Sequence, residues 1–233
     1  MKNQWFGDIH DFRKYGLLRF LNGTRQFHHI MVGWMLTPPL PNDPCGKYRS
    51  FVNHSGQGKE CDDDLFEKLK KFNSGDKERK VKNAFDLDIL SRQAFSSFGD
   101  DDERYLSDHR EDYFRKMKES DCDLVFLDAD NGLEVASMTE KKKSQYILYE
   151  EVESLYASEK SVLIYQHRAI GQSFERQIAE KIPRLPQVPM ILFRGGNVSY
   201  LLLCQNNVQR EKIQKDFENR NFPGKFLRIQ EIG

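Results

Sequence analysis

Carboxylate and amide side chains cluster in one short stretch of the sequence, residues 123–135, which reads DLVFLDADNGLEV. Its apolar first half is followed by four polar side chains, those of Asp128, Asp130, Asn131 and Glu134. Carboxylates this close repel one another unless a cation, a proton or hydrogen-bond donors compensate. One interpretation is a Mg²⁺ site at Asp128, Asp130 and Glu134, and another is a contact between Asp128 and a substrate amine. The third is a turn with Asn131-Gly132 at its corner and no chemistry.

A second polar group follows another apolar run, where Tyr165 is succeeded by Gln166, His167 and Arg168. A histidine can act as an acid, a base or a ligand near neutral pH. The amide of Gln166 suits a nucleobase or a backbone group, and Arg168 suits a phosphate. Each of these side chains is equally compatible with an ordinary structural role.

The N-terminal stretch, residues 7–16, carries two cations one helical turn apart. His10 and Lys14 are spaced i, i+4 and would share one face of a helix. They could form a small patch for a phosphate. The alternative is an ordinary amphipathic helix with Asp8 as its capping acid.

Strand and helix patterns alternate along the chain and would position these groups. The predicted strands are 29–36, 93–98, 124–127, 161–165, 190–193, 198–204 and about 226–229. The predicted helices begin near residues 9 and 62 or span 101–120, 144–157, 173–182 and 207–220. This alternation predicts one α/β domain over residues 1–233, with a doubly wound, mostly parallel sheet. An antiparallel hairpin turning at 194–197 would lie near the C-terminus, and an irregular loop spans about 38–58.

The position of the polar groups at predicted strand ends suggests where a site would lie. Ligands of open α/β sheets bind outside the carboxyl ends of the strands. We therefore expect Asp128, His167 and the first helix to line a common cleft.

Composition narrows the classes of protein. Lys plus Arg and Asp plus Glu both number 36, so the chain has no global basic field for nucleic acid. The four cysteines are scattered without a CxxC pair, which predicts neither a zinc site nor a disulfide framework. No signal-peptide pattern and no apolar run of about 20 residues is present. We expect a cytoplasmic protein that does not enter a membrane.

Three motifs resemble those of a family of mostly uncharacterised prokaryotic proteins. They are D-x-x-K-Y-G-L-L at residues 11–18, L-D-x-D-N-G-L-E at 127–134 and Y-Q-H at 165–167. More distantly, the order of elements is similar to class I methyltransferases with a Rossmann-like fold. The most similar group methylates adenine N6 in large-subunit ribosomal RNA.

This resemblance implies an enzyme that uses S-adenosylmethionine and acts on a nucleic-acid base. Asp128 would take the place of the first acid in the D-P-P-Y catalytic motif and accept a hydrogen bond from the target amine, aided by Asn131. His167 is a third candidate catalytic residue. The resemblance assigns no residue to the cofactor. Contacts to the substrate would come from Gln166 and, at the phosphates, from the cationic set His10, Lys14 and Arg168.

Two other functions remain open from the sequence. The first is a Mg²⁺-dependent nuclease or phosphodiesterase that uses the acids Asp128, Asp130 and Glu134 with His167 as base. The second is a non-catalytic binding module on a methyltransferase-like fold. Both are favoured by the lack of a glycine-rich turn after residues 29–36. Residues 129–131 also lack the aromatic residue of the D-P-P-Y motif.

Overall fold

The computed structural model describes residues 1–39, 48–53, 59–99, 105–169, 171–220, 222 and 226–231. These residues form a seven-stranded sheet in the order β2-β1-β3-β6-β8-β7-β9. The strands are β1 (Ile30–Trp34), β2 (Phe95–Phe98), β3 (Leu124–Asp128), β6 (Ser161–His167), β7 (Met190–Gly195), β8 (Val198–Leu203) and β9 (Arg228–Gln230).

Most strands of this sheet run in one direction. β1 pairs in parallel with both β2 and β3, and β3 pairs in parallel with β6. β8 is antiparallel to β6 and β7, and β9 is antiparallel to β7. The predicted α/β class, the mostly parallel sheet and the antiparallel hairpin near the C-terminus are confirmed.

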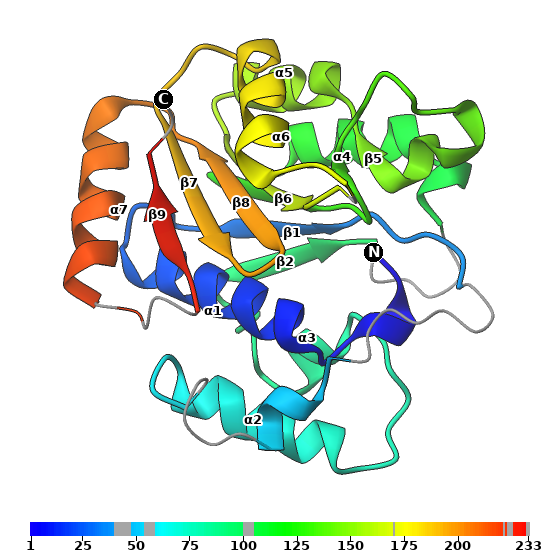
Figure 1. Cartoon of the computed structure of the whole chain (residues 1–233), viewed down its shortest axis with the longest axis vertical. Coiled ribbons are helices and arrows are strands. Elements are labelled where there is room, and N and C mark those ends of the chain that lie inside the picture. The colour runs from blue at the N-terminus through cyan, green and yellow to red at the C-terminus, as the bar shows by residue number, and fades with distance from the viewer. Residues whose placement is uncertain are drawn as a thin grey trace.

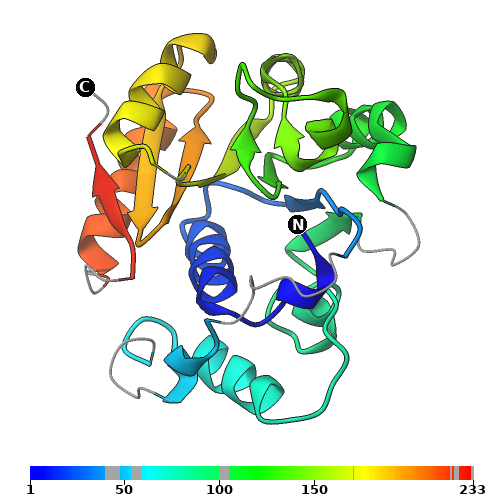
Figure 2. The same cartoon turned by 45° about the vertical axis from the view of Figure 1, so that its right-hand side comes forward.

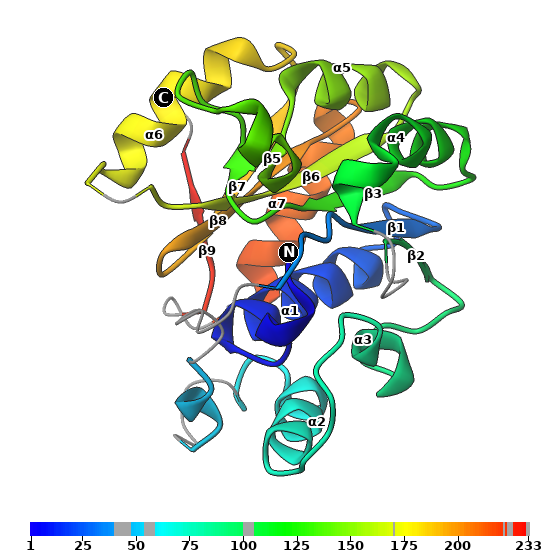
Figure 3. The ribbon, with the colours of Figure 1, turned by 90° about the vertical axis from the view of Figure 1, so that its right-hand side faces the viewer.

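Helices cover both faces of the sheet (Figures 1 and 3). They are α1 (Ile9–Gly23), α2 (Asp63–Asn73), α3 (Asn83–Asp86), α4 (Arg110–Glu119), α5 (Tyr149–Ala157), α6 (Phe174–Lys181) and α7 (Asn207–Arg220). Short 3-10 helices are η1 (Asn3–Trp5), η2 (Ser50–Asn53), η3 (Leu106–Asp108), η4 (Glu140–Gln145) and η5 (Ile182–Arg184). Helices α1 and α7 pack on one face, and α4, α5 and α6 pack on the other.

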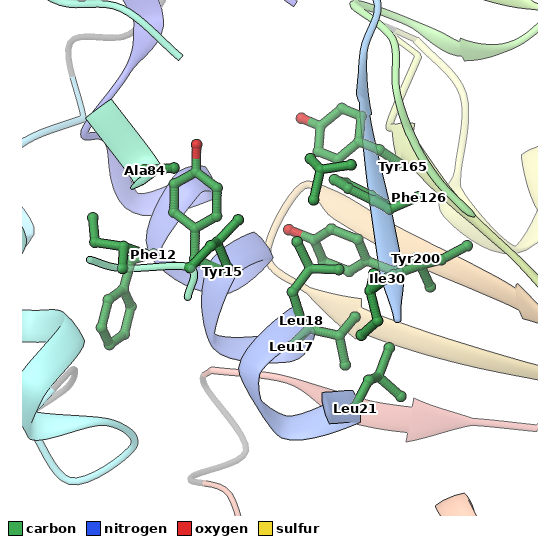
Figure 4. Close-up of a cluster of buried hydrophobic side chains, with 14 of the residues drawn as sticks. Phe12, Tyr15, Leu17, Leu18, Leu21, Ile30, Ala84, Phe126, Tyr165 and Tyr200 are labelled. Carbon is green, nitrogen blue, oxygen red and sulfur yellow. The ribbon is translucent and has the colours of Figure 1, made fainter. Parts of the chain in front are cut away.

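The strand period of two divides the buried side chains between two cores. In β3, Leu124 and Phe126 join the core beneath α1, whereas Val125 and Leu127 join the core beneath α4 and α5. Figure 4 shows the first core, where apolar side chains of α1 face the sheet. Helix α1 itself lies between the sheet and α2 (Figure 2). Both faces of the central strands are thus buried, as the near-continuous apolar runs predict.

Local signals set the bounds of α1. The carboxylate of Asp8 accepts hydrogen bonds from the backbone N–H groups of His10, at 2.8 Å, and Asp11, at 3.1 Å. These donors have no partner within the helix, so Asp8 is its N-cap. At the other end the Thr24 hydroxyl donates to the Leu21 carbonyl. The predicted start of this helix is confirmed.

Some bounds differ from the sequence prediction. A second, two-stranded sheet of β4 (Gly132–Leu133) and β5 (Tyr146–Ile147) takes up part of the helix predicted at 144–157. Strand β6 continues to His167, so Gln166 and His167 lie within the strand. Of the helix predicted at 101–120, the described part begins with η3 and becomes α-helical at Arg110.

Part of the predicted irregular loop at 38–58 lies outside the described residues, namely 40–47 and 54–58. Between those two segments the chain forms η2. Across the described part of the chain, no helix combines the length and apolar character needed to cross a bilayer.

Candidate functional site

The carboxyl ends of three parallel strands meet at one edge of the sheet. Trp34 at the end of β1 is paired in register with Asp128 at the end of β3, and β6 ends beside them at His167. The N-terminal residues reach the same edge, close to the tips of β1 and β2 (Figure 1). This edge is the place where ligands of α/β sheets bind.

Asp128 is buried and paired with α1. Its Oδ2 accepts a hydrogen bond from Lys14 Nζ at 2.6 Å, and the same ammonium donates to Asp11 Oδ1 at 2.7 Å. Asp11 Oδ2 in turn accepts from the Gly7 N–H at 2.7 Å. The side chains of all three ion-pair members are 2% exposed. Lys14 therefore does not lie in the surface phosphate patch expected with His10, because Asp11 and Asp128 draw it into the interior.

This cluster contains two carboxyl groups, those of Asp11 and Asp128, and only one ammonium group, that of Lys14. Burial lowers the pKa of Lys14, but Asp11 and Asp128 outweigh it and the pKa lies above its usual value. Burial also raises the pKa of both carboxyl groups, and the Lys14 charge opposes that rise. Lys14 thus remains protonated at neutral pH and compensates the buried carboxyl groups of Asp11 and Asp128.

Asp130 belongs to a separate ion-pair group. Its Oδ2 accepts from Lys2 Nζ at 2.7 Å and from Thr37 Oγ1 at 2.8 Å, and its Oδ1 is paired with the α-amine of Met1. Burial raises the pKa of Asp130, but the Met1 amine and Lys2 reverse that effect and lower it overall. The sequence interpretation missed Lys2, which lies 128 positions from Asp130 in sequence.

The remaining polar side chains of the 128–134 stretch make structural contacts. Asn131 Nδ2 donates to Gln145 Oε1 at 3.2 Å, beside β5. Glu134 Oε1 accepts from the Tyr149 N–H at 2.9 Å, at the start of α5. Glu134 thus faces away from the partners of Asp128 and Asp130.

The alternative Mg²⁺ site at Asp128, Asp130 and Glu134 is not supported by this geometry. In the part of the chain that the structure describes, no three His, Cys, Asp or Glu side chains are grouped to hold a metal ion. Each of the three carboxylates instead has its own protein partner. A shared metal stays a prediction, and in the structure cations and an N–H of the chain compensate these charges.

Gln166 locks the turn after Asp128 to β6. Its Oε1 accepts from the Leu133 N–H at 3.0 Å, and its Nε2 donates to the Asn131 carbonyl at 3.0 Å. Gly132 adopts φ +82°, and a Cβ there would lie 2.5 Å from Gln166 Oε1. Gln166 is 1% exposed, and both ends of its amide form hydrogen bonds within the protein. Its amide is therefore not accessible to a substrate.

His10 and His167 come together at the surface beside this cluster. Their ring centroids are 6.0 Å apart, and the ring of Tyr48 lies 6.3 Å from His10. Burial and the charge of Arg13 lower the pKa of His10 to about 4. Burial also lowers the pKa of His167, whose Nδ1 lies 3.0 Å from the Arg168 carbonyl. Arg168 itself is exposed.

The sequence predicts that Asp128, His167 and the first helix line a common cleft, and in the structure α1 contacts both residues. Helix α1 contacts Asp128 through Lys14 and contacts His167 through His10. The same helix therefore joins a buried acidic group to a surface pair of imidazoles. Tyr48 was not identified from the sequence, since only the fold brings it next to His10.

Comparisons with protein-family models, with curated proteins and with solved structures found no match to this chain.

Proposed function

We propose that this chain is a methyltransferase-like enzyme that uses S-adenosylmethionine and acts on a nucleic-acid base. The observation that carries the proposal is the strand order. β8 runs antiparallel between β6 and β7, and Asp128 ends the strand between β1 and β6. The resemblance to class I methyltransferases implies such a late reversed strand and an acid at this position.

Asp128 suits the role of an acceptor for a target amine. Lys14 Nζ holds Oδ2 at 2.6 Å. A carboxylate with one oxygen anchored presents the other in a fixed direction. Methyl transfer depends mainly on positioning, so a rigid acceptor is the principal group that the protein must supply.

The cofactor would supply an electrophilic methyl group when bound. Gly99, at φ +80°, lets the ends of β1 and β2 approach closely, since a Cβ there would lie 2.1 Å from the Trp34 carbonyl oxygen. The sequence then continues with acids at 100–103, outside the described residues, and an acid after a neighbouring strand suits ribose hydroxyls.

Titration calorimetry with S-adenosylmethionine tests this proposal. We expect heat of binding and a higher melting temperature, because a ligand that binds only the folded state stabilises it. A tritium-labelled methyl group should then pass to bulk RNA or DNA with the wild-type chain and not with Asp128→Asn. Absence of both heat and thermal shift at millimolar cofactor would contradict the proposal.

One observation favours the second candidate, a binding module without cofactor. Met1 and Lys2 cover the residues that follow β1: the Met1 amine donates to the Met35 carbonyl at 2.9 Å, and the Thr37 N–H donates to the Met1 carbonyl at 3.0 Å. This segment lies where the cofactor is expected. A chain that binds nucleic acid but gives no heat with S-adenosylmethionine would establish this candidate instead.

A further inference from the structure

Three aromatic rings from three distant segments form a row at the surface of the strand-end edge. Tyr48 precedes η2, His10 lies in the first turn of α1 and His167 ends β6. Tyr48 and His10 meet edge to face at 80°, and His10 and His167 at 76°. We call Tyr48, His10 and His167 the ring row.

The ring row is anchored, and its outer member Tyr48 is open to solvent. The Ile9 N–H donates to the Tyr48 carbonyl at 3.1 Å, which fixes the backbone of Tyr48 against the start of α1. The Tyr200 hydroxyl donates to the His10 carbonyl at 3.4 Å from the side of the sheet. The side of Tyr48 away from these contacts is free, because this residue is 66% exposed. An aromatic face is therefore presented on a fixed backbone.

We propose that the ring row is a platform on which an unpaired nucleobase of a single-stranded nucleic acid stacks, with Arg168 at the adjoining phosphate. This inference deepens the proposed function and rests on it for the choice of nucleic acid. Stacking on aromatic side chains accepts every base, because each base has a π-face. A duplex hides those faces and would bind less well.

The charges at the ring row fit this ligand. The pKa of both imidazoles lies below its usual value, so the rings are neutral near pH 7 and act as flat aromatic surfaces. The cation is Arg168, next to His167 in sequence and exposed. An exposed guanidinium can bind a phosphate through two parallel hydrogen bonds.

The position of the ring row also fits the proposed chemistry. His10 lies one helical turn before Lys14, whose ammonium is bound to Asp128. A nucleotide held at the ring row would thus lie near the acid proposed to meet the target amine. Enzymes that modify an extruded base stack it on aromatic or apolar side chains. Residues 129–131 contain no aromatic residue, so a ring from elsewhere in the chain would have to serve.

Fluorescence anisotropy with a labelled 12-nucleotide single strand, in its DNA and RNA forms, tests the platform. Tyr48→Ala should weaken binding about ten- to a hundredfold, since the stacking surface is lost. Tyr48→Phe should bind like the wild type, because the ring and not the hydroxyl is used. Val208→Ala removes another exposed apolar side chain, on α7, and should change nothing. Arg168→Gln should reduce the slope of log affinity against log salt by about one.

The outcomes separate this inference from the proposed function. Single-strand affinity that is equal for Tyr48→Ala and the wild type, or weaker than duplex affinity, would overturn the platform. Heat with S-adenosylmethionine together with that result would leave the methyltransferase proposal standing. Conversely, single-strand binding that depends on Tyr48 without heat from the cofactor would support the platform on a binding module.

Discussion

Two ion-pair groups in this molecule have the same sequence pattern and opposite surroundings. Asp11 and Lys14 in α1 are spaced i, i+3, as are Asp112 and Arg115 in α4. The first pair has side chains that are 2% exposed, whereas Arg115 is 56% exposed. The difference is that α1 turns its charges towards Asp128 of the sheet, while α4 turns its charges to water. Burial, which depends on the tertiary structure, decides which ion pair contributes to stability.

The largest effect is expected from Lys14→Met. It leaves Asp11 and Asp128 buried without their cation, which should lower the free energy of unfolding by about 3–5 kcal/mol. Denaturation in urea, followed by circular dichroism, measures this loss. Arg115→Met is the matched change in α4. Equal stability of the two variants would show that the buried group is not held together by Lys14.

The next largest effect is a pH dependence of stability that comes from His10. The pKa of His10 is near 6.5 in the unfolded chain and about 4 in the folded one. Between these values the unfolded chain binds more protons, so stability falls as the pH is lowered from 6.5 to 4, by at most about 3 kcal/mol. His10→Gln should flatten this part of the stability profile. The same change at the exposed His28 should leave the slope as it is in the wild type.

Asp128→Asn should have a smaller effect on folding than Lys14→Met. The amide oxygen can still accept the hydrogen bond from Lys14, and Asp11 still balances the ammonium. We expect a loss of about 1–2 kcal/mol in the free energy of unfolding, together with loss of methyl transfer. Retained transfer in a folded Asp128→Asn variant would remove this residue from the proposed chemistry.

The smallest effect is expected from Arg115→Met itself. Asp112 keeps its contact with Lys116, and both partners of the pair are open to solvent and screened by salt. The melting temperature should be unchanged within error at physiological ionic strength. A clear drop would indicate that surface pairs in α4 act together as a network.

Much of the fold could be predicted because its signals are local. Asp8 sets the start of α1, and Gly196-Asn197 forms the turn of the hairpin. The apolar runs predicted β1, β3 and β6, because strands that are buried on both faces do not alternate apolar and polar residues. The two-residue strands β4 and β5 were missed, since two residues show no period.

The site was harder to predict because its contacts join distant parts of the chain. Lys14 pairs with a residue 114 positions away, and Lys2 with one 128 positions away. The i, i+3 spacing of Asp11 and Lys14 is typical of an ion pair on a helix. The sequence interpretation instead grouped Lys14 with His10, at i, i+4. Nothing near Tyr48 in sequence indicated that it would contact His10.

The double contact of Gln166 has a mechanical consequence. By tying the Asn131 carbonyl and the Leu133 N–H to β6, it makes the segment after Asp128 and the end bearing His167 a single stiff unit. His167 would therefore keep its position in the ring row when a nucleotide binds.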